Sequence, residues 1–206
     1  MLAAISQLAE KVFLLYRQID EQTAALQAAT GLQCPSGCGQ CCENPDVEAT
    51  PLEVLPLALE LFRRGEALMW LERLEESGNS ICVFYRPDPV IKGNGRCSMY
   101  SWRPTICRLF GFATVKNKQG QLELAACIRH KQIMPEVVCQ TQEAIANGFL
   151  APNFSDFSIT IAAIDPYLGR ARMSINQAVA MAIKRVGLMF QLAESADTET
   201  GEGVQG

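Results

Sequence analysis

The chain has 206 residues, of which 49% are hydrophobic and 19% charged, and its formal net charge is −4. This length suffices for one domain that buries roughly 70% of its unfolded-chain surface. The composition excludes a wholly disordered, collagenous or coiled-coil protein. No apolar stretch is long enough to span a membrane, because even residues 175–193 carry Lys184 and Arg185. The N-terminus lacks a signal-like basic segment, so we expect a soluble, cytoplasmic protein with no membrane partner.

The N-terminal part of the chain is predicted to be helical. Apolar residues recur at three- and four-residue steps over 2–29, and Gly31 follows, which predicts one long amphipathic helix. The segment Thr-Pro-Leu-Glu at 50–53 is a capping-box pattern that opens a second helix ending near Gly65. A third helix is predicted over 66–76.

The helical period disappears between residues 80 and 127. Residues 81–85 are expected to form a short strand, and 111–115 are expected to pair with 121–126 as a hairpin. One short helical turn is expected after Pro104. These loops have too little periodic apolar surface to hold themselves, so we expect bound metal to staple the centre.

Helical patterns return near the C-terminus. Pro135 starts a helix that ends at 147–148, a weaker helical stretch covers 157–164, and Ser174 with Gln177 caps a last helix to about residue 192. The remainder is polar and acidic, and we expect it to be disordered.

The predicted fold class is mainly α, with a small irregular α+β centre that is rich in cysteine and stapled by metal. Residues 1–193 form a single domain whose cysteine cluster covers 34–127, and residues 194–206 are an acidic tail.

Cysteine is the most informative residue type, because nine are present. A reducing cytosol does not maintain a disulfide framework, and an odd number leaves at least one thiol unpaired. Metal binding is therefore the leading interpretation. The sharpest motif is Cys34-Pro-Ser-Gly-Cys38-Gly-Gln-Cys41-Cys42. Its short spacers let thiolates converge on one ion, and its glycines supply the positive φ and the backbone N–H groups that a metal-wrapping turn needs.

Adjacent Cys41 and Cys42 have diverging side chains, so they are expected to serve different metals or different corners of one cluster. A vicinal disulfide is disfavoured by ring strain and by the compartment. Four more thiols lie in the irregular centre. The candidate metal ligands are thus Cys34, Cys38, Cys41, Cys42, Cys82, Cys97, Cys107 and Cys127. They could build two tetrathiolate zinc sites or one iron–sulfur cluster with spare ligands, and spacing leaves this open.

Two other candidate ligands receive different interpretations. Cys139 lies inside the helix that starts at Pro135, where a free cysteine is expected to pack as a small buried hydrophobe. His130, the sole histidine, follows Cys127 at ligand-like spacing, but it lies between Arg129 and Lys131 and is expected to be solvated rather than a ligand. With one histidine, most mechanisms of histidine acid–base catalysis have little to draw on. Enzymatic activity is left open, with a non-enzymatic role favoured.

Positive charge is concentrated in the centre, because residues 82–131 contain nine Lys or Arg against two acidic residues. With Tyr100 and Trp102 between them, these cations could contact nucleic acid. We do not favour that partner, because the same segment carries four of the cysteines, and the cations could instead offset thiolate charge around a metal. A plain solvated basic face is the third interpretation.

With these motifs established, the chain resembles the YkgJ-type cysteine cluster family. The resemblance rests on the run from Cys34 to Cys42, on Cys97-Ser-Met-Tyr100 and on Arg103-Pro-Thr-Ile-Cys107-Arg108, with the remaining two centre cysteines completing the set. The first spacer here has three residues where the family has two. The family is regarded as a zinc- or iron-chelating domain. A related cluster accompanies flagellin lysine N-methylases, which implies an iron–sulfur or methyl-transfer context.

The spacing Cys34-x3-Cys38-x2-Cys41 also matches the cluster loop of radical S-adenosylmethionine enzymes. Gln40 stands where an aromatic is usual in that family, a helix precedes the loop, and no series of βα units follows, so this alternative is disfavoured. The sequence therefore predicts a protein that binds zinc or iron, with an iron–sulfur cluster as one form. The alternatives are an iron–sulfur metalloenzyme, methyltransferase-like or redox, and a partner- or nucleic-acid-binding module with structural metal.

Overall fold

The computed structural model describes residues 2–76 and 81–201, with side chains through residue 195. Over this part of the chain the protein is mainly helical, with three short two-stranded antiparallel sheets. The elements in chain order are α1 Leu2–Thr30, α2 Gln40–Glu43, β1 Glu48–Ala49, α3 Leu55–Arg63, α4 Ala67–Glu76, β2 Tyr85–Pro87, β3 Gly95–Cys97, the 3-10 turn η1 Tyr100–Trp102, α5 Thr105–Leu109, β4 Thr114–Lys116, β5 Leu122–Leu124, α6 Ile128–Ile133, α7 Pro135–Ala146, α8 Phe154–Ile164, β6 Met173–Ser174 and α9 Ile175–Gly201.

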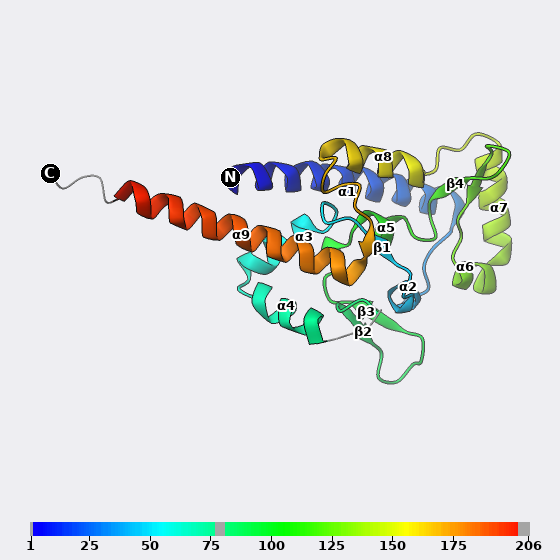
Figure 1. Cartoon of the computed structure of the whole chain (residues 1–206). Coiled ribbons are helices and arrows are strands. Elements are labelled where there is room, and N and C mark those ends of the chain that lie inside the picture. The colour runs from blue at the N-terminus through cyan, green and yellow to red at the C-terminus, as the bar shows by residue number, and fades with distance from the viewer. Residues whose placement is uncertain (1, 77–80, 202–206) are drawn as a thin grey trace.

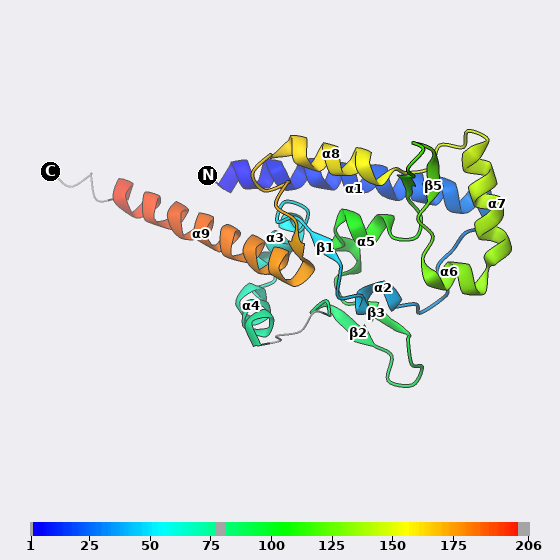
Figure 2. The ribbon, with the colours of Figure 1, turned by 45° about the vertical axis from the view of Figure 1, so that its right-hand side comes forward.

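Two long helices, α1 and α9, build the frame of the molecule. Helix α8 lies along α1 in both views, and α9 runs beside α3 and α4 before its last turns project beyond the body (Figures 1 and 2). The α1 helix ends at a left-handed residue, Gly31, whose N–H donates to the carbonyl oxygen of Gln27 over 2.9 Å. Helix α7 stands across that end of α1 (Figure 1). The thiol-bearing segments lie between α9 and α7, below α1.

The main core lies between α1, α3, α5 and α9. Its buried α1 residues recur on one face, among them Val12, Leu15 and Ile19, and they pack with residues such as Leu61 of α3 and Val186 of α9. A smaller cluster joins the C-terminal end of α1 to the β4–β5 hairpin and α7. No helix in the described chain is long and apolar enough to cross a membrane.

Most predicted elements are confirmed. The long first helix, the turn after Pro104, the β4–β5 hairpin and the helix that starts at Pro135 lie where expected. Ser174 and Gln177 form the predicted reciprocal cap of α9. The backbone N–H and side-chain oxygens of Thr50 and Glu53 also bond reciprocally, but residues 51–54 form turns, and α3 begins only at Leu55.

Two element predictions are wrong. Residues 81–84 are a turn, and the strand lies at Tyr85–Pro87, where it pairs with Gly95–Cys97 in a hairpin that alternation did not reveal. Helix α9 does not stop near Leu192 but continues to Gly201, through residues expected to belong to the disordered tail. Residues 202–206 lie outside the described chain, so the prediction of disorder remains a prediction there.

Candidate metal centre

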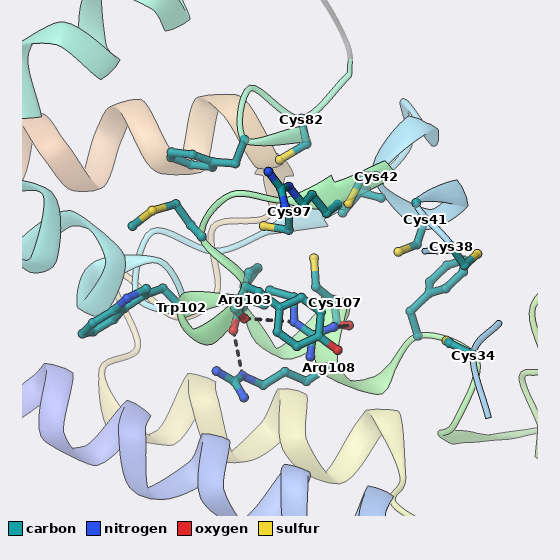
Figure 3. Close-up of a pocket in the computed structure, with 18 of the residues that line it drawn as sticks. Cys34, Cys38, Cys41, Cys42, Cys82, Cys97, Trp102, Arg103, Cys107 and Arg108 are labelled. Carbon is teal, nitrogen blue, oxygen red and sulfur yellow. Dashed lines mark hydrogen bonds between the residues drawn. The ribbon is translucent and has the colours of Figure 1, made fainter. Parts of the chain in front are cut away.

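All eight predicted ligand cysteines line a single cavity of about 1060 Å³. In Figure 3 the side chains of Cys82, Cys97, Cys42 and Cys107 lie near one another, Cys41 lies between them and Cys38, and Cys34 lies farther to that side. All nine thiols are free. The ninth, Cys139, does not line the cavity. The eight cysteines that the motifs group therefore border one space, and their role as metal ligands stays a prediction.

The thiols line this space but do not converge on one point. Among the described residues, no three His, Cys, Asp or Glu side chains converge closely enough to hold one. The donor set still suits zinc or iron, because thiolates are the ligands these metals take in structural and cluster sites.

The loop with the first four cysteines turns tightly against the β2–β3 hairpin. The N–H of Cys38 donates to the carbonyl of Pro35 over 3.1 Å, and Gly37 has a positive φ of 70°, as the motif predicted. The Gly37 carbonyl in turn accepts from the N–H of Gly95 over 2.9 Å. A Cβ on Gly39 would lie 2.6 Å from the ring of Tyr85, so this position admits only glycine without displacement.

Tyr85 fixes this contact from the hairpin side. Its hydroxyl donates to the Glu43 carboxylate over 3.0 Å and lies 3.1 Å from the carbonyl oxygen of Asn94. Burial, followed by the Glu43 carboxylate, raises the pKa of Tyr85 to about 12. The phenol therefore remains a neutral donor that joins the first thiol run to the hairpin.

Backbone N–H groups point at several of the sulfurs. The amide of His130 donates to the Sγ of Cys127 over 3.3 Å. Burial raises the pKa of Cys82 and Cys97, and amides two or three residues downstream partly oppose this rise. Hydrogen bonds to a thiolate favour its charged form, and such bonds commonly orient metal-bound sulfur.

We call Cys41, Cys42, Cys82, Cys97 and Cys107 the inner thiols. Desolvation raises the pKa of Cys82 to about 11, and it raises those of Cys97 and Cys107 as well. The pKa of Cys41 is lowered to about 7, chiefly because the Cys42 thiol hydrogen-bonds to it, and the pKa of Cys42 rises in turn. Cys41 is therefore the inner thiol that most readily carries negative charge.

Arg103 is a cation that acts on three of the inner thiols, and Arg86 also acts on Cys97. The charge of Arg103 lowers the pKa of Cys41, Cys97 and Cys107, although for Cys97 and Cys107 desolvation outweighs it. The guanidinium stacks 3.5 Å from the centre of the Tyr100 ring and donates to the Cys107 carbonyl over 3.3 Å. Arg103 thus stabilises thiolate charge, the role proposed for part of the basic segment.

Arg108, the arginine that follows Cys107, has a different role from Arg103. It is buried and donates to the carbonyl oxygens of Arg103 and Ser101 over 2.8 and 2.6 Å, and to the carboxylate of Asp20 on α1. It also lies 4.2 Å from the centre of the Tyr16 ring. These contacts tie α5, which carries Cys107, to the long first helix.

The sequence did not reveal that α1 contributes to the cavity wall. Tyr16, Asp20, Thr23 and Gln27 recur at three- and four-residue steps and line it. The Oγ1 of Thr23 is buried there without a hydrogen-bond partner in the structure. The sequence signal for this wall was the helical spacing of these polar residues on an otherwise apolar face of α1.

Two predictions about single residues are wrong. His130 is fully buried rather than solvated, because α6 turns its side chain inward against Gly111 and the ring of Phe112. Cys139 is exposed rather than packed, because α7 turns that face to solvent and buries Thr141 and Ile145 instead.

The comparisons with known proteins agree with this site. Searches of curated proteins and of solved structures find no match to the chain. A family model matches residues 33–141, more than half of the chain and a range containing all eight cavity cysteines. Its description is CxxCxxCC, "Putative zinc- or iron-chelating domain". The chain therefore belongs to the CxxCxxCC family.

Proposed function

We propose that this protein chelates zinc or iron through the eight cysteines that line the cavity. The observation that carries the proposal is their convergence, because they come from segments up to 93 positions apart between Cys34 and Cys127 yet face one space. The exposed Cys139 provides an internal contrast, since it is a free thiol outside that space.

The surrounding residues prepare the thiols to exchange protons for metal. Most inner thiols are held neutral by desolvation, while Arg103 and downstream amides favour their charged forms. A bound divalent cation supplies the positive charge that lets several thiolates coexist. The protein's own contribution is to gather the sulfurs, exclude competing solvent and limit their mutual repulsion.

The proposal is tested by elemental analysis of full-length protein purified anaerobically with a reductant. Wild-type protein should contain stoichiometric zinc or iron, Cys107→Ser should contain less, and Cys139→Ser should match wild type. Colourless protein with zinc supports a structural zinc chelator, whereas broad visible absorption with iron supports iron–thiolate or iron–sulfur ligation. Wild-type protein without tightly bound metal would refute chelation.

A second candidate function is that of an iron–sulfur metalloenzyme, and the size of the cavity favours it. At about 1060 Å³ it matches the upper range of small-molecule sites and exceeds what a metal alone needs. Trp102, Arg103 and Asp20 line it beside the sulfurs and could contact an organic ligand. Iron with acid-labile sulfide in the purified protein would favour this candidate, and zinc alone would argue against it.

A further inference from the structure

His130 occupies an unusual environment for a residue with a polar ring. Its side chain is fully buried, and its Nδ1 has no hydrogen-bond partner in the structure. Gly111 admits the ring, because a Cβ at that position would lie 3.0 Å from its Cε1 atom. The Phe112 ring packs against it at 5.2 Å between ring centres. The other ring nitrogen, Nε2, is the one with a polar neighbour in the structure.

That other nitrogen faces a thiol. The Nε2 of His130 lies 3.7 Å from the Sγ of Cys34. Two ligands of one tetrahedral zinc ion, at about 2.3 Å for sulfur and about 2.0 Å for nitrogen, lie roughly 3.5 Å apart. The observed separation is therefore close to that of two atoms that share an ion.

Cys127 belongs to the same corner of the cavity. It caps α6, and its Sγ accepts the backbone N–H of His130 over 3.3 Å, so sulfur and imidazole come from one turn of chain. Cys34 and Cys38 lie apart from Cys82 and Cys97 in Figure 3. The cavity thus contains two groups of donors.

We propose that the protein has two metal centres, and that the second is a mixed site with His130 Nε2, Cys34 and Cys127 as ligands and Cys38 as the fourth. The inner thiols form the first centre, which is all sulfur. The inference rests on the proposed chelating function and adds a ligand that the cysteine motifs do not include. It also assigns the four-cysteine run to both centres, with Cys34 and Cys38 in the mixed site and Cys41 and Cys42 in the inner one.

The test uses full-length protein expressed in cobalt-supplemented medium and purified anaerobically, with cobalt content and visible spectra measured for each variant. Cobalt(II) replaces zinc in thiolate sites, and its sulfur-to-cobalt charge-transfer absorption grows with the number of sulfur ligands. Wild-type protein should hold two equivalents. His130→Asn and Cys34→Ser should each lose one of the two and retain the stronger charge-transfer absorption of the inner centre. Cys107→Ser should retain the weaker spectrum of the mixed site, and Cys139→Ser should match wild type.

Cys34 is exposed, so Cys34→Ser tests the site even if replacing the buried His130 prevents folding. Unchanged cobalt content and spectrum in Cys34→Ser and in folded His130→Asn would overturn the mixed site while leaving chelation intact. Loss of all cobalt in both Cys34→Ser and Cys107→Ser would show a single cluster and overturn the division. Wild-type protein that binds no cobalt, zinc or iron would instead refute the proposed function itself.

Discussion

Arg108 should be a principal link between the thiol-bearing centre and the helical frame. It is buried on α5, next to Cys107, and donates to two backbone carbonyl oxygens and to Asp20 of α1. Its guanidinium also lies over the ring of Tyr16. Arg108→Met removes all of these polar contacts while retaining most of the apolar stem.

The expected cost follows from those contacts. A hydrogen bond from a charged group contributes about 1.5–3 kcal/mol to stability, and its loss leaves the acceptor without a partner. Asp20 is half-exposed and regains hydration, so the pair itself contributes towards the lower end of its range. We therefore expect Arg108→Met to reduce the free energy of unfolding by about 2–4 kcal/mol, a large share of a typical 5–15 kcal/mol.

Urea denaturation followed by circular dichroism, in reducing buffer at neutral pH, measures this loss. Asp20→Asn is the matched control, because it removes only the exposed partner and should cost about 0.5–1 kcal/mol. If Arg108→Met costs less than about 1 kcal/mol, or no more than Asp20→Asn, then the carbonyl contacts do not stabilise the fold and the reasoning is refuted.

Three further predictions concern a tight turn, the ion pairs of buried Glu60 and the metal. Gly39→Ala should destabilise the protein by about 1–3 kcal/mol in the same assay, because its Cβ would lie 2.6 Å from the Tyr85 ring; an unchanged midpoint would contradict this. Arg63 and Arg64 lower the pKa of Glu60 to about 2. These ion pairs should therefore add about 1 kcal/mol to the free energy of unfolding above the ordinary pKa of glutamate, and this contribution should be lost as the pH falls towards 2. Glu60→Gln should flatten that part of the stability curve, and parallel curves would exclude the effect. Chelation under reducing conditions should raise amide hydrogen exchange in the four-cysteine loop and the β2–β3 hairpin far more than in α1 and α9, and a uniform increase would indicate global unfolding instead.

Elements governed by local chemistry could be predicted from the sequence. The first helix follows from its apolar period and from Gly31, and the start of α9 follows from the reciprocal cap of Ser174 and Gln177. The β2 strand could not be placed, because only three residues pair and its register depends on contact with a distant loop. Tertiary contacts rather than propensity determine such short strands.

The candidate ligands followed from spacing, but the proposed division into two groups did not. His130 was assigned to solvent because charged neighbours flank it, yet neighbours in sequence point to different sides of a helix. The same geometry explains Cys139, whose apolar neighbours Val137 and Val138 face the smaller core while its thiol faces outward. Which face of a short helix is buried depends on what packs against it, and this information lies elsewhere in the chain.

The sequence predicts that metal ligation replaces a missing hydrophobic core in the centre of the chain, but segments that carry the thiols do reach the main core. Three cavity thiols are each followed two residues later by a buried apolar side chain: Phe84 after Cys82, Met99 after Cys97 and Leu109 after Cys107. Each of these segments therefore presents sulfur to the cavity while it anchors itself in the main core. This arrangement holds the sulfurs near one another before any metal arrives, so ligation would require only local closure. Burial of these apolar side chains would then offset much of the entropy lost when the ligands are gathered. The free energy of metal binding would contribute to metal affinity rather than to folding of the whole domain.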